Sequence, residues 1–221
     1  MGTIGLKRLE LLNIENEKGQ LTLGCDQLWY PKKDYLPAGA CGAAVASNIL
    51  AYLLRSRPDL YEIYVSKSER LELAKPLEDE ASEKAGFLEF MKLVYPFFLP
   101  RMGGLMSDHF CEGMAAFGKE YGLPLVAERM HITVSRSKRK SLDDVAAFIK
   151  DTLHDDIPAA FLTLSTGSAE GLENWHWVLI TAFDDETNLV KIVNNCLLSW
   201  TNVGTWLDTS IMGGAFVRLN V

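Results

Sequence analysis

The stretch "GACGAAVASNILAYLL", from Gly39 to Leu54, decides how the rest of the sequence is interpreted. A cysteine stands beside a glycine near its start, and small and apolar residues dominate the positions after them. The larger apolar side chains recur at the spacing of one helix face: Val45, Ile49, Leu50, Leu53 and Leu54. The pattern predicts a buried helix that begins within one turn of Cys41. Such a cysteine is either a small core residue or a nucleophile at a helix N-terminus.

The section from about residue 58 to residue 140 has a mostly helical pattern. "EDEASEKAGFLEFMKLVY" (78–95) and "SDHFCEGMAAFGKEYG" (107–122) both have acidic or Ser/Asp starts and apolar faces, and Gly122 is expected to end the second. "LPLVAERMHITV" (123–134) alternates like a strand. "SLDDVAAFIKDTLHDD" (141–156), which comes after this section, begins with a serine cap and carboxylates that suit a helix dipole.

From Pro158 onward the pattern changes to short strands rich in branched and aromatic residues. The expected strands are "PAAFLTL" (158–164), "HWVLITAF" (176–183), "LVKIVNN" (189–195) and "GGAFVRLNV" (213–221), with "DDETN" (184–188) as a hairpin loop. We therefore expect an α+β fold in which an N-terminal helix and an inserted helical region, at about 58–140, pack on a C-terminal antiparallel sheet. The whole chain, 1–221, is expected to form one domain.

Composition excludes several classes of function. The formal net charge of -7 disfavours nucleic-acid binding, since only "SRSKRK" (135–140) is locally basic and it is expected to be a solvated loop. No apolar run approaches the roughly 20 residues of a membrane-spanning helix, so no membrane partner is expected. The first 20 residues lack the continuous apolar region of a secretory signal, which favours a cytoplasmic location.

The four cysteines are scattered and form no zinc-type spacing, so no metal site is expected and free thiols are assumed. Glycine-rich phosphate-binding motifs are also missing, and no cofactor is expected. The cysteines and histidines without a partner motif are interpreted as core or surface residues: Cys25, Cys111, Cys196, His109, His131 and His154.

Cys41, His176 and an asparagine at 194 or 195 occur in an order that suits nucleophilic catalysis. A thiol enzyme needs a thiolate, a histidine that takes and returns a proton, and a polar group that orients the imidazole. Cys41 opens a predicted helix, whose N-terminal partial positive charge favours a thiolate. His176 opens a strand and Asn194 or Asn195 ends the strand across the hairpin, so the two side chains can lie side by side.

Cys-Gly at a helix start, "HWVLITAF", "KIVNN" and the final glycine-led strand together resemble the papain-like cysteine peptidase superfamily. "CGAAVASNILAYL" and "WHWVLITAF" are most similar to its bacterial peptidase C39-like group. The resemblance covers about residues 25–55 and 158–221. It implies a papain-like fold, with Cys41 as nucleophile, His176 as general base and acid, and Asn194, preferred over Asn195, as the orienting residue.

The same resemblance implies that a glutamine side chain and the backbone N–H of the nucleophile form an oxyanion hole, and Gln27 is the candidate glutamine. Two positions depart from the family pattern. Tyr35 stands where papain-like enzymes have the glutamine, with Gln27 further upstream, and Ala43 replaces a proline that usually follows Cys-Gly in the C39-like group.

The sequence thus favours a thiol-dependent hydrolase or acyl-transfer enzyme, a peptidase or amidase that acts on a peptide or amide through a Cys41 thioester. One alternative is a catalytically inactive papain-like domain that binds a peptide or protein. Another is an interaction protein whose helical middle section forms the interface. The sequence carries no signal of oligomeric state.

Overall fold

In a computed structural model of the chain, residues 2–35, 39–68, 77, 81–100 and 104–221 are described. The helices are α1 (Cys41–Ser56), α2 (Pro58–Lys67), α3 (Lys84–Val94), α4 (Ser107–Tyr121), α5 (Leu142–His154) and α6 (Val203–Thr209), with short 3-10 turns η1 (Leu9–Leu12), η2 (Gln27–Trp29), η6 (Tyr95–Phe98) and η7 (Arg136–Lys138). The strands are β1 (Thr3–Gly5), β2 (Asn13–Glu15), β3 (Leu21–Leu23), β4 (Ser82–Glu83), β5 (Val126–Ile132), β6 (Ala159–Thr163), β7 (His176–Asp184), β8 (Leu189–Asn194), β9 (Leu197–Asn202) and β10 (Gly214–Asn220).

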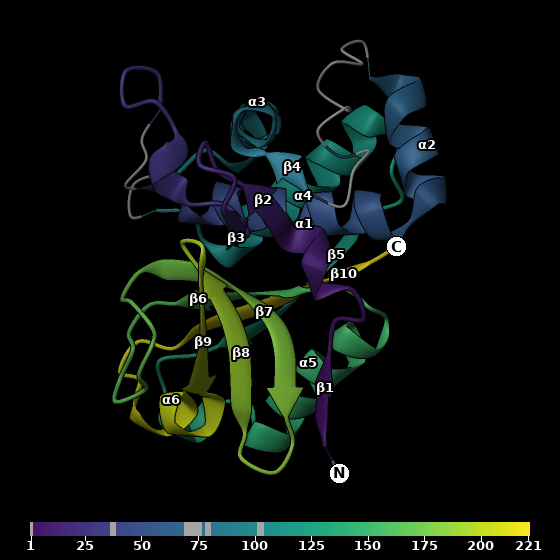
Figure 1. The fold of residues 1–221 in the computed structure, drawn as a ribbon. Helices are drawn as coiled ribbons and strands as arrows, with labels where there is room; N and C mark the ends of the chain where they lie inside the picture. Colours follow the sequence, from purple (N-terminus) through teal and green to yellow (C-terminus); the bar gives the residue numbers. More distant parts are fainter. Residues whose placement is uncertain (1, 36–38, 69–76, 78–80, 101–103) are drawn as a thin grey trace.

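Helix α1 begins at Cys41, as its apolar pattern predicts. Its first 14 residues are all buried, and most of them are small or apolar. The chain leaves the helix at Arg57, whose backbone is extended, and Pro58 then starts α2 at a position where a proline needs no N–H partner. Figure 1 shows α1 to α4 gathered in one half of the molecule and the large sheet in the other.

The large sheet has the strand order β5-β10-β6-β7-β8-β9, and all its pairs are antiparallel. Strand β1 also pairs with β7, along residues 182–184, beyond the part of β7 that β6 occupies. The expected α+β class with an antiparallel sheet is confirmed. The sheet is not purely C-terminal, because β1 comes from the start of the chain and β5 from the predicted insertion.

Alternation along the strands gives the large sheet two buried faces. The face toward α1 presents Ala160, Leu162, Trp177, Leu179, Val193, Ala215 and Val217. The opposite face, toward α5 and α6, presents Ala159, Phe161, Val178, Ile180, Ile192 and Phe216. Helices pack on both faces and hold the central strands in place. The ends of β7 and β8 therefore have well-defined positions.

Several local predictions are confirmed. Gly122 ends α4 in a left-handed conformation with a φ of 69°. Ser141 caps α5, and the loop 184–188 joins β7 to β8. The predicted helix over 78–95 is wrong at its start: Ser82 and Glu83 form β4, which pairs in parallel with β2, and α3 begins only at Lys84. Residues 78–80 of that predicted helix lie outside the described part of the chain.

In the part of the chain that the structure describes, none of the helices combines the length and apolar character needed to cross a membrane.

Candidate functional site

Cys41 is the first residue of α1 and is 8% exposed. The preceding residue, Ala40, offers no side chain to cap the helix, and its carbonyl accepts the first intrahelical bond from the N–H of Ala44. The N–H groups of the first turn therefore have no intrahelical partner. This end of the helix carries partial positive charge, which favours an anionic oxygen bound beside Cys41.

His176 is the first residue of β7 and is buried. Its Nε2 atom lies 2.8 Å from Oδ1 of Asn194, the last residue of β8. The paired register of β7 and β8 ends at Leu179 and Val193, so both side chains belong to residues beyond the paired part of these strands. The contact predicted between a histidine and an asparagine on adjacent strands is present.

The side chain of Cys41 lies close enough to the ring of His176 to raise the pKa of the imidazole. Burial lowers the pKa of His176, but the interactions with Cys41, the hydrogen bond to Asn194 and the charge of Glu173 raise it, and the pKa lies above its ordinary value. Since the amide oxygen of Asn194 only accepts, Nε2 carries the proton that it receives. Nδ1 is then the nitrogen left to face Cys41.

The choice between the two asparagines is decided by the hairpin between β8 and β9. Asn194 pairs with Leu197, and the two residues between them, Asn195 and Cys196, have φ values of 47° and 66°. Two left-handed residues in a two-residue loop are typical of a type I′ turn. Asn195 thus forms the turn, and Asn194 contacts His176.

Gln27 lies in η2, which packs against α1. The neighbouring residue Cys25 fixes this segment: its N–H donates to Asn48 at 3.0 Å and its thiol donates to the carbonyl of Ala44 at 3.4 Å. The Oε1 atom of Gln27 is buried, and among the described residues it has no hydrogen-bond partner. The structure therefore places Gln27 beside the first turns of α1 without a hydrogen bond to Cys41.

An apolar pocket of about 340 Å3 opens beside Cys41. Its lining consists of Gly39, Cys41, Gly104, Leu105, Met106, Leu162, Leu164, Trp175 and Trp177. Trp177 is buried, stacks on Phe110 with ring centroids 4.5 Å apart and donates its indole N–H to the carbonyl of Leu105 at 2.8 Å. Trp175 is half exposed and has a φ of 56°, an unusual backbone conformation for a bulky residue. The two tryptophans that flank His176 thus form one wall of this pocket.

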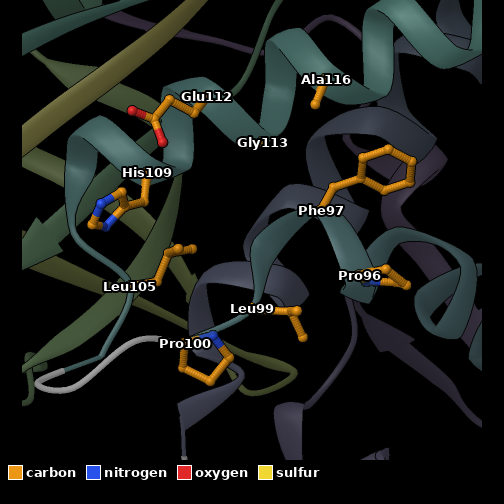
Figure 2. A pocket seen from close by; sticks show the side chains of 9 residues that line it. All are labelled: Pro96, Phe97, Leu99, Pro100, Leu105, His109, Glu112, Gly113 and Ala116. Atoms are coloured by element: carbon orange, nitrogen blue, oxygen red, sulfur yellow. The ribbon is translucent and has the colours of Figure 1, made fainter.

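A second hollow, of about 530 Å3, lies between α4 and η6 (Figure 2). Its lining side chains come from Pro96, Phe97, Leu99, Pro100, Leu105, His109, Glu112 and Ala116, with Gly113 at the helix surface. Leu105 lines both hollows. His109 and Glu112 make one side of the second hollow polar.

Glu173 also belongs to the site, although the sequence did not single it out. Its carboxylate accepts a hydrogen bond from Nδ2 of Asn194 at 2.9 Å. The residue lies in the segment before β7, where no periodic pattern or motif marks it. The only signal was chemical: an asparagine that orients a histidine with its oxygen has an NH₂ group that needs an acceptor.

The other cysteines differ from Cys41 in their surroundings. Burial raises the pKa of Cys25 well above its ordinary value and raises the pKa of both Cys111 and Cys196 to about 11. All four cysteines are free thiols. Among the described residues, no group of three or more His, Cys, Asp or Glu side chains is arranged to hold a metal ion.

Comparison with known proteins found no protein-family model that matches the chain and no matching curated protein.

Proposed function

We propose that the protein is a papain-like, thiol-dependent hydrolase or acyl-transfer enzyme that cleaves a peptide or amide bond. The observation that carries this proposal is the placement of Cys41 beside the ring of His176, which in turn contacts Asn194 at 2.8 Å. A core cysteine has no need of a buried histidine at its sulfur. Support for a papain-like arrangement comes from the position of the nucleophile on a helix N-terminus and of its partners on the adjoining sheet.

In the proposed reaction, Nδ1 of His176 takes the proton of the Cys41 thiol, and the resulting thiolate attacks the carbonyl carbon, whose oxygen becomes an oxyanion. The N–H of Cys41 stabilises this oxyanion, and we propose the side-chain NH₂ of Gln27 as a second donor. The tetrahedral intermediate collapses, the C–N bond breaks, and His176 gives its proton to the leaving amine. His176 then takes a proton from water or another acceptor nucleophile, which attacks the thioester and releases Cys41.

The pocket beside Cys41 supports an apolar group on the substrate. Leucine, methionine and tryptophan side chains make up most of its lining, and the described lining contains no charged side chain. Burial of an apolar side chain there would contribute binding energy close to the scissile bond, where it can lower the barrier to reaction.

The first test is alkylation of Cys41 by iodoacetamide, measured by peptide mass spectrometry as a function of pH. The partly exposed Cys111, whose pKa is raised to about 11, serves as an internal reference in the same sample. We expect Cys41 to react faster than Cys111 at pH 6–7, and His176→Ala to slow Cys41 by at least about tenfold. His154→Ala, which changes an exposed histidine at the end of α5, is the matched control.

The second test is amine release from a panel of peptides with fluorogenic amide leaving groups and apolar side chains. Cys41→Ala is expected to reduce kcat by about 100-fold or more, and mass spectrometry should detect an acyl adduct on Cys41 of the wild-type protein. If Cys41 reacts no faster than Cys111, forms no adduct and is insensitive to His176→Ala, the enzyme proposal is wrong. A protein that binds such peptides without turnover would support the alternative of an inactive binding domain.

A further inference from the structure

We propose that Glu173 is a positioning residue of this site, which sets the orientation of the Asn194 amide and through it the proton position on His176. This inference rests on the proposed function for its catalytic consequence. The contacts that carry it are the hydrogen bond from Asn194 Nδ2 to Glu173 Oε1, at 2.9 Å, and the contact of Asn194 Oδ1 with His176 Nε2, at 2.8 Å.

The donor and acceptor groups of Glu173, Asn194 and His176 allow only one arrangement of the hydrogen bonds between them. A carboxylate only accepts hydrogen bonds, so Glu173 selects the NH₂ end of the Asn194 amide and leaves the oxygen for the imidazole. The amide oxygen also only accepts, so it selects the tautomer of His176 with the proton on Nε2. Nδ1 is thereby kept available for Cys41. Without Glu173, the NH₂ group of Asn194 loses its acceptor, and nothing else described at this end of the amide keeps the oxygen turned toward His176.

The backbone around Glu173 is held in place from β6. The hydroxyl of Thr163 donates to the carbonyl of Glu173 and lies 3.3 Å from the carbonyl of His176. The side chain of the next residue, Asn174, accepts from the N–H of Thr166 at 2.9 Å. Trp175 then takes its left-handed conformation between Glu173 and His176. These hydrogen bonds, together with the strained backbone of Trp175, indicate that the surrounding structure fixes the backbone of residues 173–175. The side chain of Glu173 itself is exposed.

Two titratable groups of the described residues influence His176. Cys41 approaches from α1 and Glu173 from the segment before β7, and both raise the pKa of the imidazole. Asn194, from β8, contributes a hydrogen bond but no charge. A change at Glu173 therefore has a readout on His176 that does not depend on turnover.

The experiment compares Glu173→Gln and Glu173→Ala with the wild type by NMR titration of His176. Both variants are expected to lower the pKa of His176, because each removes the negative charge that faces it. Glu170→Gln is the matched control: it removes an equal charge from an exposed position in the same segment and is expected to leave the titration unchanged. Alkylation of Cys41 near neutral pH is expected to fall about tenfold in Glu173→Ala and less in Glu173→Gln, which keeps an acceptor oxygen.

Asn194→Asp gives a sharper comparison, because it places a second carboxylate against Glu173. We expect this variant to lose reactivity at Cys41, and Glu173→Gln to restore part of that reactivity in the double variant, since glutamine can donate to the new aspartate. Rescue by a substitution that is harmful on its own would show that the side chains at 173 and 194 interact directly in the site.

The outcomes separate the two proposals. If wild-type Cys41 lacks enhanced reactivity, the proposed function fails, while a shifted His176 titration in Glu173→Gln still supports the contact series. If wild-type Cys41 is reactive but Glu173→Gln titrates and alkylates like Glu170→Gln, and no rescue of Asn194→Asp occurs, the positioning role of Glu173 is overturned and the proposed function stands.

Discussion

Gly42 has little room beside the candidate nucleophile. A Cβ atom at this position would overlap Leu105 Cδ2 and lie 3.2 Å from Trp177 Cδ1. Both neighbours are buried and both line the pocket next to Cys41. The glycine that follows the cysteine is therefore explained by packing, because α1 starts directly against the side chains that shape the pocket.

Gly42→Ala is expected to destabilise the protein by about 1–3 kcal/mol, since the added methyl group overlaps the side chain of Leu105, which has to shift. It should also slow alkylation of Cys41, because relief of the overlap must move Leu105 or the start of α1. Urea unfolding gives the stability change and peptide mass spectrometry the alkylation rate. Gly2→Ala, at an exposed position where a Cβ meets no neighbour, is the control and should match the wild type.

The sequence allowed three residues of the site to be found because each stands at a recognisable boundary. Cys41 opens a helix, His176 opens a strand and Asn194 ends one. Glu173 stands at no such boundary, and its role depends on where its segment folds back. The position of Gln27 beside α1 likewise depends on long-range packing, which spacing along the chain does not report.

At the scale of elements, helix α5 shows a well-formed N-terminus. The Ser141 hydroxyl accepts from the N–H of Asp144 at 3.1 Å, and the Asp144 carboxylate accepts from the N–H of Ser141 at the same distance. This reciprocal capping box satisfies two N–H groups at the helix end. Hydrogen bonds from the side chain and backbone of Ser141 lower the pKa of Asp144.

Ser141→Ala should therefore lower the free energy of unfolding by about 1 kcal/mol, the usual effect of losing a helix cap. Urea unfolding at pH 7 measures it. The expected difference shrinks as the pH falls through the lowered pKa of Asp144, because the protonated carboxyl accepts hydrogen bonds less strongly. Ser137→Ala, in the exposed turn η7, is the control. Equal unfolding curves for wild type and Ser141→Ala would contradict the assigned cap.

Elements with strong periodicity or clear end signals were predicted, and those that depend on distant pairing were not. Strand β9 carries exposed apolar side chains at Leu197, Leu198 and Trp200, so its pattern lacks the alternation of a half-buried strand. Helix α6 has seven residues and is too short for its spacing to stand out. Strand β4 has two residues and exists through its pairing with β2.

At the scale of the whole molecule, Asp156 joins three parts of the chain. Its Oδ1 atom accepts from the Tyr52 hydroxyl of α1 at 2.7 Å and from the N–H of Lys7 at 2.8 Å. Asp156 itself follows α5 and has a φ of 57°. Three parts of the chain therefore meet at the Asp156 carboxylate: helix α1, the N-terminal segment and the turn that leads into β6.

Tyr52→Phe should destabilise the protein by about 1 kcal/mol, because it removes one hydrogen bond to a charged group at this junction and keeps the buried ring. The midpoint of urea unfolding measures the change. Tyr35→Phe is the matched control, since the ring contacts of Tyr35 with Tyr30 and Tyr95 persist in phenylalanine. A Tyr52→Phe protein as stable as the control would show that the junction contributes little.

The α+β class could be predicted at this scale because most helical patterns precede residue 158 and most strand patterns follow it. The strand order could not, because it joins segments that are far apart. Strand β1 pairs with β7 on the same side as β6, further along the strand. Strand β5 pairs with β10 and forms an outer strand of the sheet. The local sequence of β1 or β5 does not indicate which strand it pairs with.

The place of β10 in the sheet has a consequence for synthesis of the protein. It is the last strand in chain order, yet it lies between β5 and β6 in the interior of the large sheet (Figure 1). On the ribosome, Cys41 emerges long before His176 and Asn194, and the sheet that carries these two residues closes only when β10 has been made. The nascent chain therefore carries Cys41 without the folded surroundings of the proposed site until β10 has been made.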